Sequence, residues 1–143
     1  MDWNIEDLEE WDNKICEIAK SFNLDWFPIN YEICDYYEMI GHMSYHGMPS
    51  LYNHWSYGKS FEVTHQQYNM GMEGLPYELI INSNPSIAYL MRQNPLYLQI
   101  LIMAHCVGHS DFFKNNRMFQ DTRPDSVTSR FRNARKRIQK YTE

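Results

Sequence analysis

The longest apolar stretch of the chain, residues 95–113, holds two histidines four positions apart, His105 and His109. An Asn-Pro pair stands at its start, which is typical of a helix N-terminus. Because a helix turns every 3.6 residues, the two imidazoles would lie on one face about 6 Å apart, within reach of one divalent ion. Ordinary hydrogen-bonded histidines show the same spacing, so both interpretations stay open. The run is apolar nearly all round, which predicts that this helix and its histidines are buried.

Two amphipathic helices are predicted near the two ends of the chain. Residues 4–22 repeat apolar side chains at helical spacing, with Asn4 as the N-cap and acids in the first turn. Residues 124–142 form a basic helix with Arg and Lys on its outer face. Its apolar seam should pack against the domain or a second chain, since a short free helix is marginal in water. The seam consists of Val127, Phe131, Ala134, Ile138 and Tyr141.

Between these helices the sequence alternates between strand and loop patterns. Residues 25–34 are aromatic and β-branched, and Pro28 favours an edge strand. Residues 35–57 are broken by glycine and proline, as in a long ordered loop that carries function. The apolar run 77–82 is a second strand, which we expect to pair with the first.

The remaining segments complete a mixed fold. Residues 59–72 are predicted to be helical, and a short helix should follow the Ser83-Asn84-Pro85 turn. The predicted fold class is therefore α+β, mainly helical, with a small β-hairpin or sheet and a buried HxxxH helix. We expect one domain over residues 1–143, with an acidic N-terminal helix, a loop-rich middle, the buried helix and the basic helix.

Composition excludes several classes of protein. With 143 residues, 43% of them hydrophobic and 15% aromatic, the chain can bury one real core. No run approaches the length of a membrane span, and the N-terminus lacks the features of a signal peptide, so we expect a cytoplasmic protein. Three cysteines without a CxxC pair support neither a disulfide framework nor a cysteine-only zinc site.

The net charge of −5 is distributed unevenly. Residues 1–40 hold eleven acids and two bases, whereas residues 114–143 hold nine bases and three acids. One interpretation is that the two regions are solvated helix faces that pack near one another. The other is that the basic C-terminal region is a tail that binds a polyanion. Because the chain as a whole is acidic, we expect no nucleic acid as a partner.

Three blocks of the sequence resemble the SpoVR family, the stage V sporulation protein R group. They read YNHWSYGK at 52–59, YELIINSNP at 77–85, and HCVGH at 105–109 followed by DFFKNN at 111–116. Family members are usually several times longer, so the chain resembles their N-terminal third. The resemblance implies a bacterial cytoplasmic protein linked to sporulation and to the spore cortex, a peptidoglycan layer, without supplying a biochemical activity. Three histidines, His42, His46 and His65, lie outside these blocks.

The matching blocks offer a complete set of metal ligands. His105 and His109 come from one helix, and His54 from the preceding loop is the candidate for a third nitrogen ligand. Glu78 is either a fourth ligand or the catalytic general base acting on a bound water. The alternatives are that Glu78 points to solvent from an edge strand and that His54 stacks on Trp55. The expected cofactor is a divalent transition metal, with zinc as the first choice.

The helix differs from the H-E-x-x-H pattern of zinc proteases at one position that matters. Cys106 stands where the glutamate base would be, so the base must come from elsewhere, and Glu78 is our choice. Cys106 itself points about 100° away from His105, as a core residue or a less favoured ligand. Asp111 is interpreted as a helix-end residue, with support of a ligand histidine as the alternative.

These residues are compatible with two classes of function. The first is metal-assisted amide hydrolysis in a cell-wall-related substrate. The second is a non-enzymatic interaction module, in which the histidines form a polar core and the charged helices dock a protein partner. The oligomeric state does not follow from the sequence.

Overall fold

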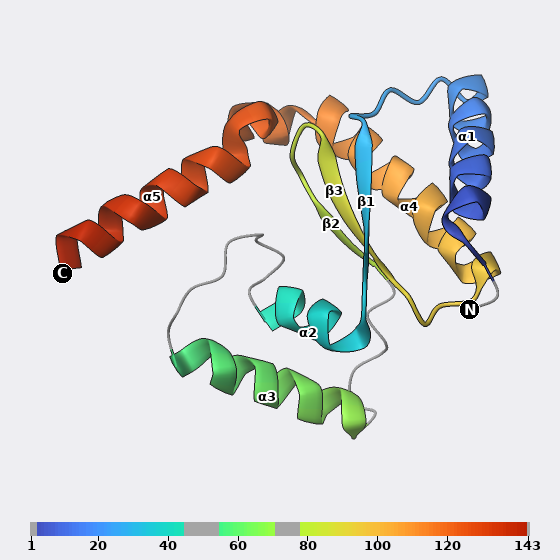
Figure 1. Ribbon diagram of the computed structural model, residues 1–143. Helices are drawn as coiled ribbons and strands as arrows, with labels where there is room; N and C mark the ends of the chain where they lie inside the picture. The colour runs from blue at the N-terminus through green and yellow to red at the C-terminus, as the bar shows by residue number, and fades with distance from the viewer. Residues whose placement is uncertain (1–2, 45–54, 71–77, 143) are drawn as a thin grey trace.

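The computed structural model describes residues 3–44, 55–70 and 78–142. These residues form a mainly helical α+β fold with a small mixed sheet, which confirms the predicted class (Figure 1). Among the helices described, none combines the length and the apolar composition that crossing a membrane requires. The elements in chain order are α1 (Ile5–Ser21), β1 (Ile29–Cys34), α2 (Tyr36–Ser44), α3 (Trp55–Asn69), β2 (Leu79–Ile81), β3 (Ser86–Met91), α4 (Leu96–Asn115), the 3-10 helices η1 (Arg117–Thr122) and η2 (Pro124–Ser126), and α5 (Val127–Thr142).

The sheet has the strand order β1-β3-β2. β1 runs parallel to β3, with Ile29 opposite Ser86, and β2 runs antiparallel to β3, with Leu79 opposite Tyr89. β1 is an edge strand of the described sheet, as the proline before it predicts. The expected direct pairing of the segments 25–34 and 77–82 is wrong, because β3 lies between them.

β3 replaces the short helix expected after Pro85. Ala88 and Leu90 belong to the core cluster on one face of the sheet, whereas Tyr89 and Met91 belong to the cluster on the other face. A central strand that is covered on both faces does not show the alternation of apolar and polar residues that marks a half-exposed strand. A short apolar run without that alternation fits a buried strand as well as a buried helix.

The two faces of the sheet are covered by different helices. On one face α4 packs against the sheet and α1 packs against α4, so that Leu8 and Ile15 of α1 join Met103 and Val107 of α4 in one cluster (Figure 1). On the other face α2 contributes Met39 to the second cluster. The prediction of a long loop over 35–57 is therefore wrong at both ends, because α2 forms near its start and α3 begins at Trp55.

The helix ends are set by local hydrogen bonds. The Asn4 side chain accepts from the Asp7 N–H at 2.9 Å and the Asp7 carboxylate accepts from the Asn4 N–H at 2.8 Å, which confirms the predicted cap of α1 as a capping box. The N-cap of α4 is Pro95 rather than Asn94. Asn94 is buried, and its carbonyl accepts a hydrogen bond from Trp3 Nε1 at 2.7 Å.

α5 extends away from the body of the molecule (Figure 1). None of its described residues is buried, and its apolar seam is open: Phe131 is 48% exposed, Ile138 64% and Tyr141 92%. The first seam residues, Val127 and Phe131, line a pocket together with β2, whereas the described residues do not cover Ile138 and Tyr141. Covering by a second chain stays a prediction.

Candidate metal centre

Three side chains from two segments converge at the surface of α4. Glu78 Oε1 lies 3.0 Å from His105 Nε2 and 3.8 Å from His109 Nε2. Each of the three residues offers one ligand atom, and these atoms all lie within 4.8 Å of one another. Two imidazoles and a carboxylate at these distances are a donor set that zinc and related divalent ions bind.

The helix and the sheet position these groups independently. The two histidines are one turn apart on α4, and their rings meet edge to face with centroids 4.4 Å apart. Phe113, a further turn along, stacks on the ring of His109 at 5.9 Å. Glu78 directly precedes β2, and the pairing of Leu79 with Tyr89 on the central strand fixes where that carboxylate leaves the sheet. The site is therefore formed by Glu78, which directly precedes the edge strand β2, and by two histidines on the outer face of α4.

The site is open to solvent, which corrects the prediction that the histidines are buried. The side chain of His105 is 55% exposed, that of His109 39% and that of Glu78 38%. α4 buries only the stripe that faces the sheet and α1, including Ile102 and Met103. The apolar composition of the helix overstates its burial because its outer face also carries apolar residues, such as the 62% exposed Leu101.

Cys106 points into the core beside the site. It is fully buried in the cluster that α1, α4 and the sheet share. Burial, followed by the negative charge of Glu78, raises the pKa of this thiol to about 12. A thiol that stays protonated at neutral pH is a poor general base, and full burial keeps this one away from the exposed ligand group. Cys106 is therefore a core residue.

The other histidines do not join this group where the structure describes them. His42 stacks on Tyr89 with ring centroids 4.1 Å apart, and burial lowers its pKa. His65 on α3 packs against aromatic rings, including that of Phe61. His54, the expected third nitrogen ligand, lies outside the described residues, so its place at the site stays a prediction.

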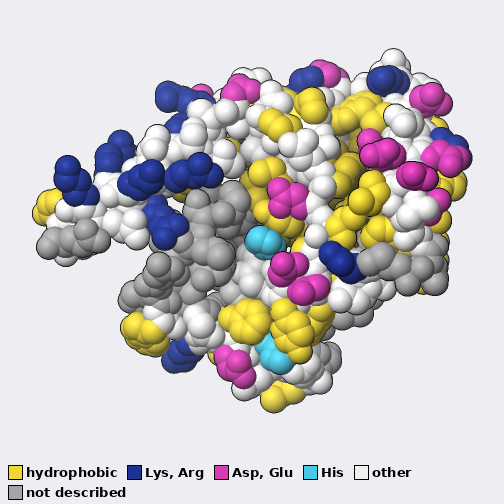
Figure 2. Space-filling model, viewed as in Figure 1, with side chains coloured by type: hydrophobic (Ala, Val, Ile, Leu, Met, Phe, Trp, Pro, Cys, Tyr) yellow, Lys and Arg dark blue, Asp and Glu magenta, His cyan; other side chains and the backbone are white. Residues whose placement is uncertain are grey.

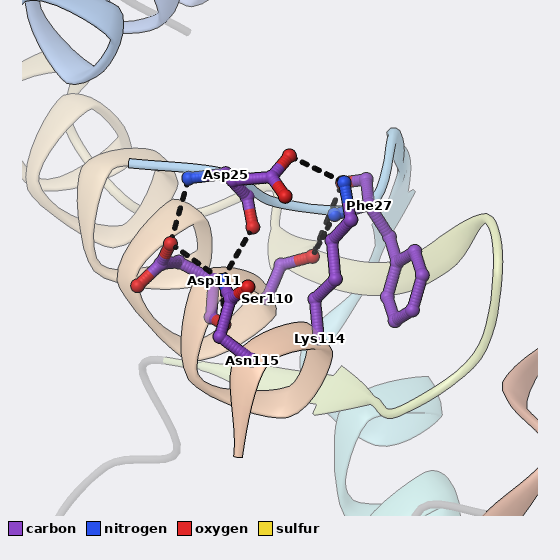
Figure 3. Close-up of polar contacts among 6 residues, drawn as sticks. All are labelled: Asp25, Phe27, Ser110, Asp111, Lys114 and Asn115. Carbon is purple, nitrogen blue, oxygen red and sulfur yellow. Dashed lines mark hydrogen bonds and ion pairs between the residues drawn. The ribbon is translucent and has the colours of Figure 1, made fainter. Parts of the chain in front are cut away.

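The turn of α4 that follows the histidines forms hydrogen bonds and an ion pair with the segment that leads into β1 (Figure 3). Asp111 Oδ1 accepts from the Asp25 N–H at 2.7 Å, and Asn115 Nδ2 donates to the Asp25 carbonyl at 2.8 Å. Lys114 forms an ion pair with the Asp25 carboxylate, and Ser110 bonds both backbone groups of Phe27. Asp111 thus has a structural role, but it links α4 to the Asp25 backbone rather than capping the helix, whose C-cap is Asn116. The sequence carries no signal for the Ser110 contacts, because a serine in an apolar helix does not name its partner.

Comparison with known proteins places the chain in a family. The family model described as "SpoVR like protein" matches residues 2–143, so the chain belongs to the SpoVR-like family. It is similar to "Uncharacterized protein YcgB" of Escherichia coli (strain K12), with 42% identity over 144 residues. The match covers 99% of this chain and 28% of that protein, so the chain spans little more than a quarter of its relative. No solved structure matches the chain.

Proposed function

We propose that this chain is the metal-binding module of a SpoVR-family protein and holds one divalent transition metal, with zinc as the first choice. His105, His109 and Glu78 are the proposed ligands that the structure describes, and His54 is the proposed fourth. The observation that carries the proposal is the convergence of three ligand atoms within 4.8 Å.

The spacing of these atoms fits a single ion. With metal–ligand bonds of about 2.0–2.1 Å in a tetrahedral arrangement, neighbouring ligand atoms are about 3.3 Å apart. The distances from Glu78 to the two histidines, 3.0 and 3.8 Å, bracket that value. A metal-free ion pair is the competing explanation, but exposed pairs contribute little to stability and do not require a second histidine.

The proposed chemistry is hydrolysis of an amide in a cell-wall-related substrate. With His54 as the fourth protein ligand, a water would bind as a fifth ligand, and the ion would lower the pKa of that water toward neutrality. Oε1 of Glu78 faces both histidines, which favours the ligand role for this oxygen. The second oxygen of the same carboxylate, Oε2, is then the proposed acceptor for the proton of the bound water. The solvent exposure of the site leaves room for a substrate. The role in sporulation and spore cortex formation that the family name implies is part of this proposal.

Metal analysis of untagged protein tests the proposal. After loading with zinc and dialysis, the native chain should retain about one ion per molecule. A double variant, His105→Ala with His109→Ala, should lose it, whereas His65→Gln should retain it because His65 lies on another helix. Free zinc at about 100 times the Kd should raise the melting temperature of the native chain by roughly 5–10 °C and leave that of the double variant unchanged. Retention of zinc by the double variant would refute the site.

A single variant separates the two roles of Glu78. If the carboxylate is a ligand, Glu78→Gln weakens metal binding. If it acts only as the base, Glu78→Gln keeps the metal and loses the release of amino groups from peptidoglycan stem peptides. Full hydrolysis by zinc-loaded Glu78→Gln would exclude the base role, and a zinc affinity equal to that of the native chain would exclude the ligand role.

A further inference from the structure

The outer edge of β2 borders a groove. β2 is an edge strand, and no described strand pairs with it on the side away from β3. A cavity of about 460 Å³ is lined by the successive residues Leu79, Ile80, Ile81 and Asn82. Leu79 and Ile81 pack with the core cluster on one face of the sheet, and Ile80 packs with the cluster on the other face. Because successive strand residues point to opposite faces, a cavity that touches all of them runs along the edge of the strand.

The opposite wall of this groove consists of η1 and the first turns of α5. Its apolar members are Phe119, Val127 and Phe131, and Phe131 is 48% exposed. Figure 2 shows basic side chains along the α5 arm and hydrophobic side chains exposed on the body of the molecule beside the start of that arm. The cavity has the size of a ligand-binding pocket, with strand backbone on one side and apolar side chains on the other.

The groove begins at the candidate metal centre. Glu78 directly precedes Leu79, the first residue of β2 and of the groove. A row of aromatic rings makes a second connection. The ring of His109 stacks on Phe113, and Phe113 meets the groove residue Phe119 edge to face with ring centroids 5.6 Å apart. A ligand in the groove therefore has one end beside the proposed metal ligands.

The other end of the groove offers a hydrogen-bond acceptor. Asn82 Oδ1 is buried, and no described residue donates a hydrogen bond to it. Buried polar atoms normally have a partner, so a ligand that donates a hydrogen bond here would satisfy this oxygen. The Ile81 carbonyl already accepts from the Ser83 N–H at 2.9 Å. A ligand would therefore pair with the strand backbone that precedes this carbonyl, toward Glu78.

We propose that the groove binds an extended peptide segment, which adds to the sheet beside β2 and brings one of its amides to the metal centre. The backbone of an extended peptide alternates donors and acceptors, as an edge strand requires of its partner. Residues 79–82 span about 13 Å, the length of four extended residues. The inference rests on the proposed function for the role of the metal, and it identifies the substrate class as a polypeptide.

Fluorescence anisotropy with a labelled peptide in which Leu and Thr alternate tests this proposal. The metal-free native chain should bind the peptide with a Kd below about 1 mM, the weak end of specific affinity. The same peptide with every backbone amide N-methylated should bind about tenfold more weakly or worse, because its donors to the strand are lost. Equal affinity for the two peptides would mean that the groove takes any apolar ligand, and it would overturn strand pairing.

Two exposed residues of α5 provide a matched pair of variants. Phe131→Ala should weaken peptide binding about fivefold or more, because this ring lines the groove. Ile138→Ala should leave binding unchanged, because Ile138 is 64% exposed and is not a groove residue. Circular dichroism shows whether each variant keeps its helices. Equal effects of the two substitutions would overturn the proposed groove.

Zinc binding is measured separately, so that the metal centre and the groove can fail independently. The double variant His105→Ala with His109→Ala should lose zinc and keep the peptide affinity of the metal-free native chain. A native chain that retains zinc but does not bind the peptide at about 1 mM protein would overturn the groove alone. A native chain that binds the peptide but retains no zinc would overturn the metal centre and support the groove as a peptide-binding site.

Discussion

Ser110→Ala should destabilise the protein far more than the loss of one hydroxyl at a surface. Ser110 is fully buried in α4. Its Oγ accepts from the Phe27 N–H at 3.1 Å, donates to the Phe27 carbonyl at 3.1 Å, and lies 3.1 Å from Ser86 Oγ. The hydroxyl therefore joins α4 to both the β1 entry segment and the start of β3.

The magnitude follows from these contacts. Two hydrogen bonds to the Phe27 backbone are worth about 1 kcal/mol each, and leaving its N–H without an acceptor adds about 1 kcal/mol or more. Alanine has a better helix propensity than serine, which offsets about 0.5 kcal/mol of this loss of stability. The expected loss in the free energy of unfolding is about 2–3 kcal/mol, with little cavity term because alanine keeps the Cβ.

Urea unfolding of the variant and a matched control measures this loss. Ser129→Ala removes an exposed hydroxyl from α5 that bonds the Ser126 carbonyl at 3.0 Å, and it should cost less than about 0.5 kcal/mol. The slope m should be unchanged, so the difference appears in the midpoint. A Ser110→Ala midpoint equal to that of Ser129→Ala would refute the reasoning.

Three further predictions concern the core, a cap and a thiol. Leu90→Ala, at a fully buried position of the central strand, should cost about 2–5 kcal/mol by urea unfolding, and a loss below about 1 kcal/mol would contradict its place in the core. Asn4→Ala removes half of the capping box of α1 and should cost about 1 kcal/mol, whereas an unchanged melting curve would show that the cap is not formed in solution. The folded Cys106 thiol keeps its proton to a pKa of about 12, while the unfolded thiol releases it near 9.0, so the free energy of unfolding should fall as the pH rises from 9 to 12. In native protein at pH 8 an alkylating reagent should modify Cys106 much more slowly than the partly buried Cys16, and equal rates would place Cys106 outside the core.

The helices that the sequence predicts best are those with their own local signals. α1 has an N-cap and a clear 3.6-residue period, and the structure places it at Ile5–Ser21. The expected range 95–113 agrees with α4 at Leu96–Asn115. These elements are encoded by neighbours in sequence, so no knowledge of the tertiary fold is needed.

Features that depend on distant partners were not predictable in the same way. β3 is a strand because it is sandwiched between β1 and β2, and its own sequence does not exclude a helix. The exposure of His105 depends on which faces of α4 are covered, which periodicity cannot report for a helix that is apolar all round. The approach of Glu78 to His105 and His109 follows from strand pairing, which the spacing of residues along the chain does not contain.

The contacts that fasten α4 to the N-terminal segments have a consequence for synthesis on the ribosome. Trp3 bonds the Asn94 carbonyl, Phe27 bonds Ser110, and Asp25 pairs with Lys114, so each contact joins residues more than eighty positions apart. At about 5–20 residues per second, the nascent chain waits roughly 5–20 s between the emergence of α1 and that of the helix that covers it. During that interval the apolar side of α1 has no native partner in α4, and we expect the acids on its outer face to disfavour association of the nascent segment. The acidic face of α1 would then favour solubility before the native fold forms.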